Sequence, residues 1–333
     1  MILITGAAGY IGSHTAINFL NNGYDVVAFD NLSTGHIEII NELKHIGNID
    51  FTQGDLCNKD DIEKVFEKYD IDAVVHFAAF SLVEESVKNP SKYYRNNVLG
   101  TINLLDSMVK HGVKKFVFSS TCATYGEPQY VPIDEKHPQK PINPYGNSKL
   151  CIEMILKDYD KAYGLKSICL RYFNVSGCDE LCRVGEWHDN ETHLIPNVLK
   201  SAIENNKEFK LYGNNYDTPD GTCIRDYVNV EDLAEAHRLA YIYIKENDKS
   251  DVFNIGSEHG NSVKEVFEAC ENVLNKNIKI KIVERREGDP STLYADSSKA
   301  KKLLKWAPKK SLKDSIRTAY TWELKLEEFK KGQ

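Results

Sequence analysis

The chain has 333 residues, which is enough for one large domain or two domains of ordinary size. Hydrophobic residues make up 41% and charged residues 27%, the usual proportions of a globular protein with a packed core. The net charge is −7 and the Lys and Arg residues are scattered, so we expect no nucleic-acid partner. No apolar stretch approaches the roughly 20 residues of a membrane-spanning helix, so we expect no membrane partner either.

The opening residues and the cysteines bear on the cellular compartment. The chain begins with the strand-like run MILITG and has no charged leader before it, so we expect no signal peptide. The eight cysteines lack the regular close spacing of a disulfide framework. Only Cys178 and Cys182 lie close together, and no His/Cys pair follows them at zinc-site spacing. We therefore expect reduced thiols, a cytoplasmic protein and no metal site.

The first half of the chain alternates short apolar runs with longer amphipathic stretches. Between the first two runs, Ile11, Ala16, Phe19 and Leu20 fall on one face of a helix that ends at Gly23. Runs rich in Val, Ile and Phe that are separated by helices indicate a parallel sheet covered on both faces, which predicts a doubly wound α/β fold of the Rossmann type. The predicted strands are residues 1–5, 25–30, 49–55, 73–79, 115–120 and 167–174.

The pattern changes after residue 175. Residues 175–197 are polar and irregular, which indicates a surface excursion or a substrate loop. Beyond them we expect three helices and one returning strand, namely helices from 193, over 230–246 and from 263, and a strand at 251–256, before the chain closes on residues 311–331. We therefore predict a first domain at 1–175 and a smaller α/β domain at 176–333, which sends segments back to the first and forms a cleft with it.

Three glycines mark the turn between the first strand and the first helix. Gly6, Gly9 and Gly12 follow the spacing GxxGxxG, where glycine permits a tight turn, close approach of the backbone to a pyrophosphate, and close packing of helix on strand. The N-terminus of the helix then offers free N–H groups and a positive dipole end. A structural turn would need no more than one of these features, so their combination predicts a dinucleotide site.

The ends of the next strands support this prediction. Asp30 ends the second strand, where a carboxylate accepts hydrogen bonds from an adenine ribose and repels a 2′-phosphate. No arginine follows in the segment NLSTG, so NAD is favoured over NADP. Asp55 and Leu56 close the third strand, and residues 77–79 close the fourth, at the edge that lines the cofactor crevice.

A candidate catalytic group lies at the start of a later helix. Tyr145 and Lys149 are spaced i and i+4, so they lie on one helical face. An adjacent ammonium favours the phenolate, which can then accept a proton from a hydroxyl whose carbon is losing a hydride. The spacing YxxxK alone is common on solvated helices. Here a strand that ends at Thr121 precedes it and supplies a hydroxyl for proton relay, which makes the combination specific.

Motifs over nearly the whole chain resemble the UDP-galactose 4-epimerases, which are extended short-chain dehydrogenases/reductases. In order, these motifs are GAAGYIGSH, HFAA, FSSTCATYG, NPYGNSK, RYFNVSG, GTCIRDYVNV and RREGD. The resemblance implies that Tyr145 is the base, that Lys149 modulates it and binds the nicotinamide ribose, and that Thr121 is the relay hydroxyl. Some family members carry Ser at the Thr121 position.

The resemblance also implies which residues hold NAD. These are Gly6, Gly9, Tyr10, Ile11, Gly12, Asp30, Asn31, Leu32, Ser33, Thr34, Gly35, Asp55, Leu56, Phe77, Ala78, Ala79, Phe80, Ser81, Asn96, Thr121, Tyr145, Lys149 and Phe173. Some relatives have Lys where Ser81 stands, so that contact differs within the family.

A second set is implied to bind the UDP-hexose. It comprises Asn174, His193, Leu194, Tyr212, Arg225, Arg286, Asp289 and Leu293. Arginine suits a diphosphate because its guanidinium is permanently charged and bidentate. His193 stands where some relatives have Asn, and either side chain can donate to a phosphate. Leu293 is implied to face the C2 substituent of the hexose.

The implied reaction is inversion at C4 of the hexose through a 4-keto sugar, with NAD regenerated in each cycle. A 4,6-dehydratase or a UDP-glucuronate decarboxylase would share the fold, the cofactor and YxxxK, but those families carry acids after the catalytic Thr, where Cys122 and Ala123 stand here. A non-catalytic NAD-sensing protein would typically lose the Tyr/Lys pair, which this chain keeps. Relatives are commonly homodimers built on a helix bundle, so we expect a homodimer formed by the helix over 145–164 and the one near Ile102.

Overall fold

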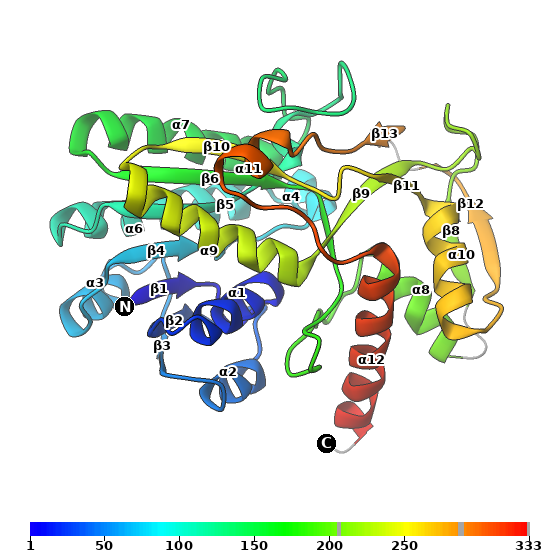
Figure 1. The fold of residues 1–333 in the computed structure, drawn as a ribbon, viewed down its shortest axis with the longest axis horizontal. Coiled ribbons are helices and arrows are strands. Elements are labelled where there is room, and N and C mark those ends of the chain that lie inside the picture. Colours follow the sequence, from blue (N-terminus) through cyan, green and yellow to red (C-terminus); the bar gives the residue numbers. More distant parts are fainter. Residues whose placement is uncertain (205–207, 286–289, 332–333) are drawn as a thin grey trace.

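The main sheet is parallel throughout and lies between layers of helices (Figure 1). The computed structural model describes residues 1–204, 208–285 and 290–331. Seven strands pair in the order β10-β6-β5-β4-β1-β2-β3. Their bounds are β1 Ile2–Thr5, β2 Val26–Asp30, β3 Ile49–Gln53, β4 Ala73–His76, β5 Lys115–Thr121, β6 Lys166–Tyr172 and β10 Asp251–Ile255. All carboxyl ends therefore meet at one edge, and the order reverses between β1 and β4, which confirms the doubly wound fold.

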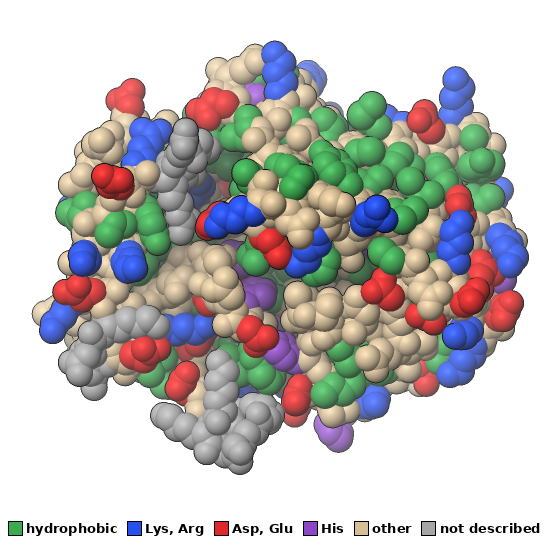
Figure 2. Space-filling view, turned by 180° about the vertical axis from the view of Figure 1, so that it is seen from behind, with side chains coloured by type: hydrophobic (Ala, Val, Ile, Leu, Met, Phe, Trp, Pro, Cys, Tyr) green, Lys and Arg blue, Asp and Glu red, His purple; other side chains and the backbone are tan. Residues whose placement is uncertain are grey.

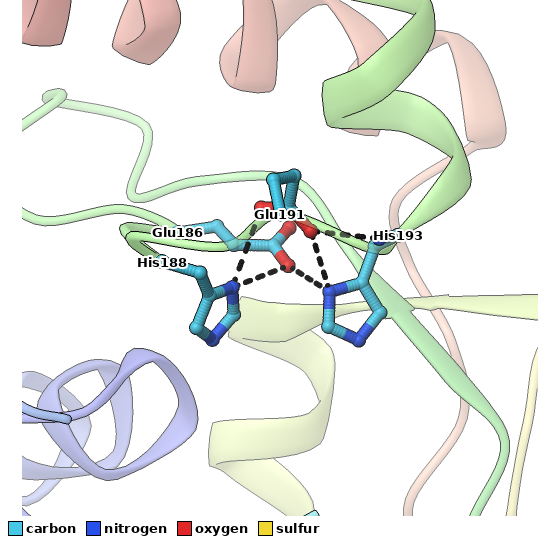
Figure 3. Close-up of side chains that lie close together, drawn as sticks. All are labelled: Glu186, His188, Glu191 and His193. Atoms are coloured by element: carbon cyan, nitrogen blue, oxygen red, sulfur yellow. Dashed lines mark hydrogen bonds and ion pairs between the residues drawn. The ribbon is translucent and has the colours of Figure 1, made fainter. Parts of the chain in front are cut away.

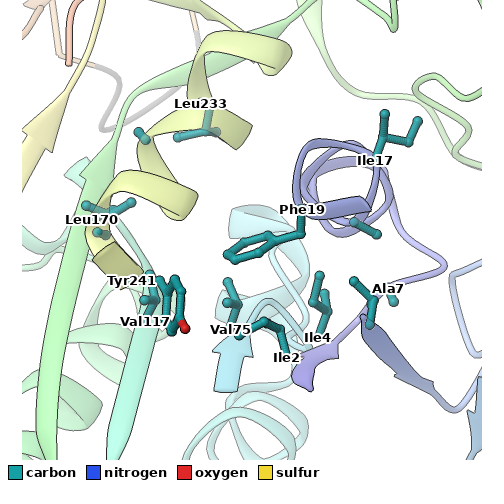
Figure 4. Close-up of a cluster of buried hydrophobic side chains, with 14 of the residues drawn as sticks. Ile2, Ile4, Ala7, Ile17, Phe19, Val75, Val117, Leu170, Leu233 and Tyr241 are labelled. Atoms are coloured by element: carbon teal, nitrogen blue, oxygen red, sulfur yellow. The ribbon is translucent and has the colours of Figure 1, made fainter. Parts of the chain in front are cut away.

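Helices cover both faces of this sheet because successive strand residues point to opposite faces. Ile2 and Ile4 of β1 pack on one face in a core with Phe19 of α1 (Tyr10–Asn21) and Tyr241 of α9 (Val230–Asn247), part of which Figure 4 shows. Leu3, between them, belongs to the core on the opposite face. That core includes residues of α3 (Lys59–Lys68), α6 (Gly100–Lys110) and α7 (Pro144–Tyr163).

The remaining elements form a smaller layer beside the main sheet. Strand β9 (Ile224–Asn229) pairs with β7 (Asn174–Ser176), β11 (Gly260–Ser262) and β13 (Thr292–Leu293), and β8 (Phe209–Tyr212) pairs with β12 (Ile280–Val283). Helices α8 (Leu194–Ile203), α10 (Val263–Leu274) and α12 (Leu312–Lys331) share a third core with this layer. No helix within the described ranges has the length and apolarity needed to cross a bilayer.

Two elements that follow residue 176 belong to the first layer. Strand β10 pairs with β6 in register from Asp251↔Ile168 to Ile255↔Tyr172, and α9 packs against α1. The predicted division at residue 175 places both in the second domain as returning segments, and that division stays a prediction.

The shorter elements are α2 Ile37–Lys44, α4 Val83–Lys88, α5 Pro90–Tyr93, the π-helix η1 Tyr94–Leu99, the 3-10 helix η2 Cys122–Thr124 and α11 Ser298–Leu303.

The irregular segment 175–197 is only partly a surface excursion. Cys178 and Val184 are buried in the first core, and Gly185 lies so close to Trp322 that a Cβ there would come within 2.3 Å of the ring. The polar backbone is satisfied by helix side chains, since Asp179 N donates to His14 Nε2 at 3.0 Å. The surface-excursion alternative is therefore wrong for Cys178 and Val184, which neighbouring helices cover, whereas the substrate-loop alternative stays a prediction.

Candidate active site

The glycine-rich turn forms a cradle that side chains would fill. Gly6 has φ +73°, and a Cβ on it would lie 2.7 Å from the backbone nitrogen of Ala78. A Cβ on Gly12 would lie 2.1 Å from the carbonyl oxygen of Gly6. Helix α1 begins after Gly9, and none of its described neighbours caps it with a side chain. Its first N–H groups and its positive dipole end therefore suit an anionic ligand such as a diphosphate.

Asp30 lies at the carboxyl end of β2, beside the cradle. Its carboxylate accepts hydrogen bonds from the backbone N–H of Ala8 at 3.0 Å and of Leu32 at 2.8 Å. Burial raises the pKa of Asp30, and these two hydrogen bonds offset part of that effect. A carboxylate has about four lone-pair sites, so two acceptor positions are left for the hydroxyls of a ribose.

The loop after β2 packs tightly on the same turn. A Cβ on Gly35 would lie 2.7 Å from Cβ of Ala8, so the loop 30–35 approaches the cradle closely. Asn31 donates to Asp55 at 3.0 Å, which ties the ends of β2 and β3 together. The predicted cofactor residues from three strand ends thus form one continuous edge.

Two predicted cofactor residues direct their side chains elsewhere. The hydroxyl of Tyr10 donates to the carbonyl oxygen of Gly177 at 2.5 Å, and Leu56 is buried in the core beneath the sheet.

The predicted catalytic residues meet where β5 ends and α7 begins. A Cβ on Gly146 would lie 2.6 Å from the carbonyl oxygen of Ala123, so the first turn of α7 contacts the segment after Thr121. Lys149 is buried, donates to the carbonyl oxygen of Ser119 at 2.8 Å, and lies 4.9 Å from the centre of the Phe118 ring. These contacts fix the lysine against the strand that carries Thr121.

Burial dominates the protonation of this group. It lowers the pKa of Lys149 to about 7, while the carboxylate of Glu153 raises it. Burial also raises the pKa of Tyr145 well above its usual value, and contact with the Thr121 hydroxyl opposes this. That the Lys149 ammonium favours the Tyr145 phenolate stays a prediction.

Several predicted substrate residues lie on the side of Thr121 that faces the smaller layer. Leu293 in β13 pairs directly with Arg225 in β9. Leu293 packs against a buried cluster that includes Phe173 and Cys122, the residue after Thr121. Arg225 donates to the carbonyl oxygens of Ile224 and Pro290, each at 2.7 Å. The structure therefore brings Arg225 and Leu293 next to the catalytic strand end.

The other predicted substrate residues are more dispersed. Asn174 begins β7 and pairs with β9, His193 precedes α8, Leu194 begins it, and Tyr212 ends β8 and is exposed. Arg286 and Asp289 lie outside the described residues. For these positions the role in substrate binding stays a prediction.

Comparison with known proteins identifies the family. A family model described as GDP-mannose 4,6 dehydratase matches residues 3–319. The UDP-glucose 4-epimerase of Halalkalibacterium halodurans is 47% identical over 322 residues, which cover 96% of this chain and 95% of the relative. The chain belongs to the UDP-glucose 4-epimerase family.

Solved structures of epimerases agree in fold. The UDP-glucose 4-epimerase of Brucella ovis in complex with NAD is 44% identical, with a TM-score of 0.91 over 96% of this chain and 97% of the other. The enzyme of Bifidobacterium longum, solved in complex with NAD+ and UDP, is 40% identical, with a TM-score of 0.91 over 97% and 98%. The resemblance drawn from the motifs is thereby confirmed.

In this epimerase fold, Asn97 has a positioning role that the sequence analysis missed in favour of its neighbour Asn96. Asn97 accepts from Phe80 N at 2.9 Å, and its amide donates to Phe80 O at 3.0 Å and to Ser148 at 3.2 Å. It thus holds the loop after β4 against the catalytic helix. Asn96 donates to the Asn97 side chain at 3.0 Å. No local pattern distinguishes the two asparagines.

A buried ion pair beneath the epimerase site was also missed. Arg171 of β6 and Glu153 of α7 form two hydrogen bonds, of 2.6 and 3.0 Å. Ser120 donates to Glu153 at 2.6 Å, and Arg171 donates to Tyr125 at 2.9 Å. Glu153 lies one turn beyond Lys149, so this pair anchors to β6 the helix that carries the lysine.

Proposed function

We propose that the protein interconverts UDP-glucose and UDP-galactose by inverting C4 of the hexose, with NAD held as a permanent cofactor. The observation that carries the proposal is the meeting of Tyr145, Lys149 and Thr121 at the cofactor edge of the sheet. Membership in the UDP-glucose 4-epimerase family supports it, as do the relatives crystallised with NAD and UDP.

The residues present fit NAD. The absence of Cβ atoms at Gly6 and Gly12 lets the turn pack closely on the backbone of Ala78 and on itself, which leaves the start of α1 available to a diphosphate, and Asp30 keeps acceptor positions for the adenine ribose. When bound, NAD supplies a hydride acceptor and the positive charge of the nicotinamide ring. Lys149, on the same helix as Tyr145, would hold the nicotinamide ribose.

The protein's own residues handle the proton. Tyr145 takes the proton of the hexose 4-hydroxyl as C4 is oxidised, and Thr121 beside it relays that proton. The same proton returns when C4 is reduced on the opposite face, so the reaction is balanced within each cycle. The 4-keto sugar must turn over between the two steps, so binding energy belongs on the UDP group rather than on the hexose. Among the described residues, Arg225 is a cation suited to binding the UDP group, because it lies beside Leu293.

The rival reactions need an acid that this site does not offer. Elimination from C5–C6 in the dehydratases uses carboxylates after the catalytic Thr, where Cys122 and Ala123 stand here. Burial raises the pKa of the Cys122 thiol to about 12, so it stays protonated and is a very weak acid. A non-catalytic NAD sensor would not require the buried Lys149 beside Tyr145.

A direct test incubates the purified protein with UDP-galactose, without added NAD, and measures UDP-glucose. We expect UDP-glucose with no change in mass. A product lighter by one water would identify a dehydratase instead. Tyr145→Phe serves as the control because it retains the ring but lacks the hydroxyl that carries the proton.

We also propose that the protein is a cytoplasmic homodimer that pairs through the face of α7. The support is a group of exposed hydrophobic side chains on neighbouring elements, with Val87 of α4 62% exposed and Met154 of α7 59% exposed. Figure 2 views the molecule from behind and shows hydrophobic side chains gathered at the upper right. This part of the molecule holds α7, which lies at the upper left in Figure 1. Patches of this kind mark protein–protein contacts.

Light scattering after size-exclusion chromatography tests the dimer. The wild type should have twice the mass of the chain, and Val87→Glu with Met154→Glu should be monomeric. Leu181→Glu, at another exposed position, should leave the dimer intact. A monomeric wild type would overturn this proposal without affecting the proposed reaction.

A further inference from the structure

Four side chains of metal-ligand type meet just before α8. Glu186, His188, Glu191 and His193 each offer one ligand atom, and these four atoms lie within 4.8 Å of one another. Figure 3 shows both imidazoles presenting Nδ1 to the same space between the two carboxylates. The spacing Glu-x-His-x-x-Glu-x-His brings all four from one short loop, so the cluster needs no other element to complete it.

The cluster has nearly the dimensions of a tetrahedral metal centre. The Nδ1 atom of His188 lies 3.3 Å from a carboxylate oxygen of Glu186 and 3.3 Å from one of Glu191. The Nδ1 atom of His193 lies 2.7 Å from Glu186 and 2.9 Å from Glu191. Metal–ligand bonds of about 2.0–2.1 Å in a tetrahedron place neighbouring ligand atoms about 3.3–3.4 Å apart. A small outward movement of the side chains therefore makes room for an ion.

Hydrogen bonds within the cluster do not satisfy Glu186. Its Oε1 atom is buried and lies in contact with both Nδ1 atoms, but it accepts no hydrogen bond from the described residues. One carboxylate oxygen and two imidazole nitrogens therefore face the same space, in which a single ion can contact all three.

The charges are compatible with a bound ion. The side chains of Glu186 and Glu191 are only 7% and 5% exposed, and two buried carboxylates side by side require compensating positive charge. Without an ion, the two imidazoles supply that charge as protonated groups, because the carboxylates raise the pKa of His188 to about 9 and also raise the pKa of His193. A dication bound to two neutral imidazoles and two carboxylates is electrically balanced. Two nitrogen and two oxygen ligands in four-coordinate geometry suit zinc better than calcium or magnesium, which require six or more oxygen ligands. We propose that Glu186, His188, Glu191 and His193 form a binding site for one divalent cation, preferentially Zn²⁺.

Neighbouring elements hold the frame of this site. The indole of Trp322 in α12 donates to the carbonyl oxygen of Glu186 at 2.8 Å. The ring of Trp187 stacks on His36, with centroids 3.8 Å apart and an angle of 9° between the planes. The carboxylate of Glu191 accepts from the backbone N–H of His193 at 2.7 Å. These contacts, rather than the ion, join the loop 186–193 to α12.

The site also bears on the predicted role of His193. A cation on Nδ1 leaves the ring hydrogen on Nε2, which fixes the tautomer that can donate to a phosphate. This consequence rests on the proposed function, whereas cation binding itself does not.

Zinc binding to the complete protein tests the site. The protein is stripped with a chelator, titrated with Zn²⁺ in a calorimeter, and then assayed for zinc by mass spectrometry after dialysis. We expect one ion per chain and a higher unfolding temperature with zinc than without it. Cobalt in place of zinc should give the intense visible bands of a tetrahedral centre, a measurement that needs no variant. A wild type that retains no zinc, or weak octahedral cobalt bands, would overturn the proposal.

Variants locate the ion. His188→Ala removes a partly exposed ligand, and Glu186→Gln preserves side-chain shape. Loss of an outer-shell partner weakens metal binding by about 10–100-fold, and each of these variants should weaken zinc binding by more than that. His45→Ala, at an exposed histidine, and Cys182→Ser, at a nearby thiol, should leave it unchanged. Zinc that is lost with Cys182→Ser but retained by His188→Ala would contradict the assignment. Because no substrate is present, these results are independent of whether the enzyme is an epimerase.

Discussion

Glu153→Gln should destabilise the protein strongly, because it leaves a buried guanidinium without its partner. The side chains of Arg171 and Glu153 are 4% and 2% exposed and are joined at 2.6 Å. Removing one partner of such a pair costs about 3–5 kcal/mol, mainly from the uncompensated charge that remains. Replacing both partners with apolar side chains of similar volume is often neutral or stabilising. The double variant Glu153→Leu with Arg171→Met should therefore recover most of the loss.

Equilibrium unfolding in urea, at one fixed NAD concentration, measures these free energies. Glu235→Gln is a matched control, since Glu235 pairs with Arg238 at 2.6 Å but is more exposed, and it should cost less than about 1 kcal/mol. If Glu153→Gln also costs less than about 1 kcal/mol, or if the single effects simply add in the double variant, the pair does not hold α7 as described.

The same variant should alter catalysis in a direction that packing alone does not predict. The carboxylate of Glu153 raises the pKa of Lys149, so its removal lowers that pKa further. The ammonium of Lys149 is then lost at lower pH, and the alkaline limb of the kcat profile should move to lower pH. An unchanged profile with reduced kcat would indicate a purely structural role for Glu153.

Four further changes test single residues. Tyr145→Phe should keep its bound NAD but lose about 10²–10⁴-fold in kcat, and unchanged turnover would refute its role as the base. Asp30→Asn should weaken NAD binding and relax the rejection of NADP; mass analysis of the cofactor released on denaturation should find NAD, not NADP, in the wild type. Leu293 should give a preference of about 10- to 200-fold for the UDP-glucose/UDP-galactose pair over the N-acetylated pair, because the acetamido group would overpack the site at a cost of about 1–3 kcal/mol. Leu293→Ser should reduce this preference. Equal wild-type efficiencies on the two pairs would exclude Leu293 as the residue that discriminates between them. Burial lowers the pKa of His237 to about 4, below its unfolded value. The contribution of the neutral imidazole to the free energy of unfolding is therefore complete above about pH 6.5 and is lost as the pH falls toward 4. His237→Leu should therefore reduce the loss of unfolding free energy between pH 7.5 and pH 5 by about 2 kcal/mol, as measured in urea, and identical losses would contradict this.

Local signals in the sequence account for the parts of the fold that could be predicted. The glycine turn after β1, the strand runs and the helices from 230 and 263 each depend on residues close together in the chain. Asp30 and Tyr145 could be placed because parallel strands end at one edge.

Contacts between distant residues account for what the sequence did not reveal. The burial of Cys178 and Val184 depends on α1 and α12, which lie far away along the chain. The pairing of Glu153 with Arg171 joins a helix to a strand, and the pairing of β13 with β9 joins segments with little pattern of their own. The proposed cation site before α8 does have a local signal, in the spacing of its His and Glu residues, but that spacing differs from the Cys and His patterns of zinc sites.

The fate of the hydrogen at C4 tests the central claim most directly. UDP-galactose that carries deuterium at C4 of the hexose is converted by the wild type in ordinary water, without added NAD, and the UDP-glucose is examined by mass spectrometry and NMR. Because C4 loses a hydride that returns to its other face, the product should keep the deuterium at C4. Loss of deuterium to the solvent, or a dehydrated product, would contradict the account.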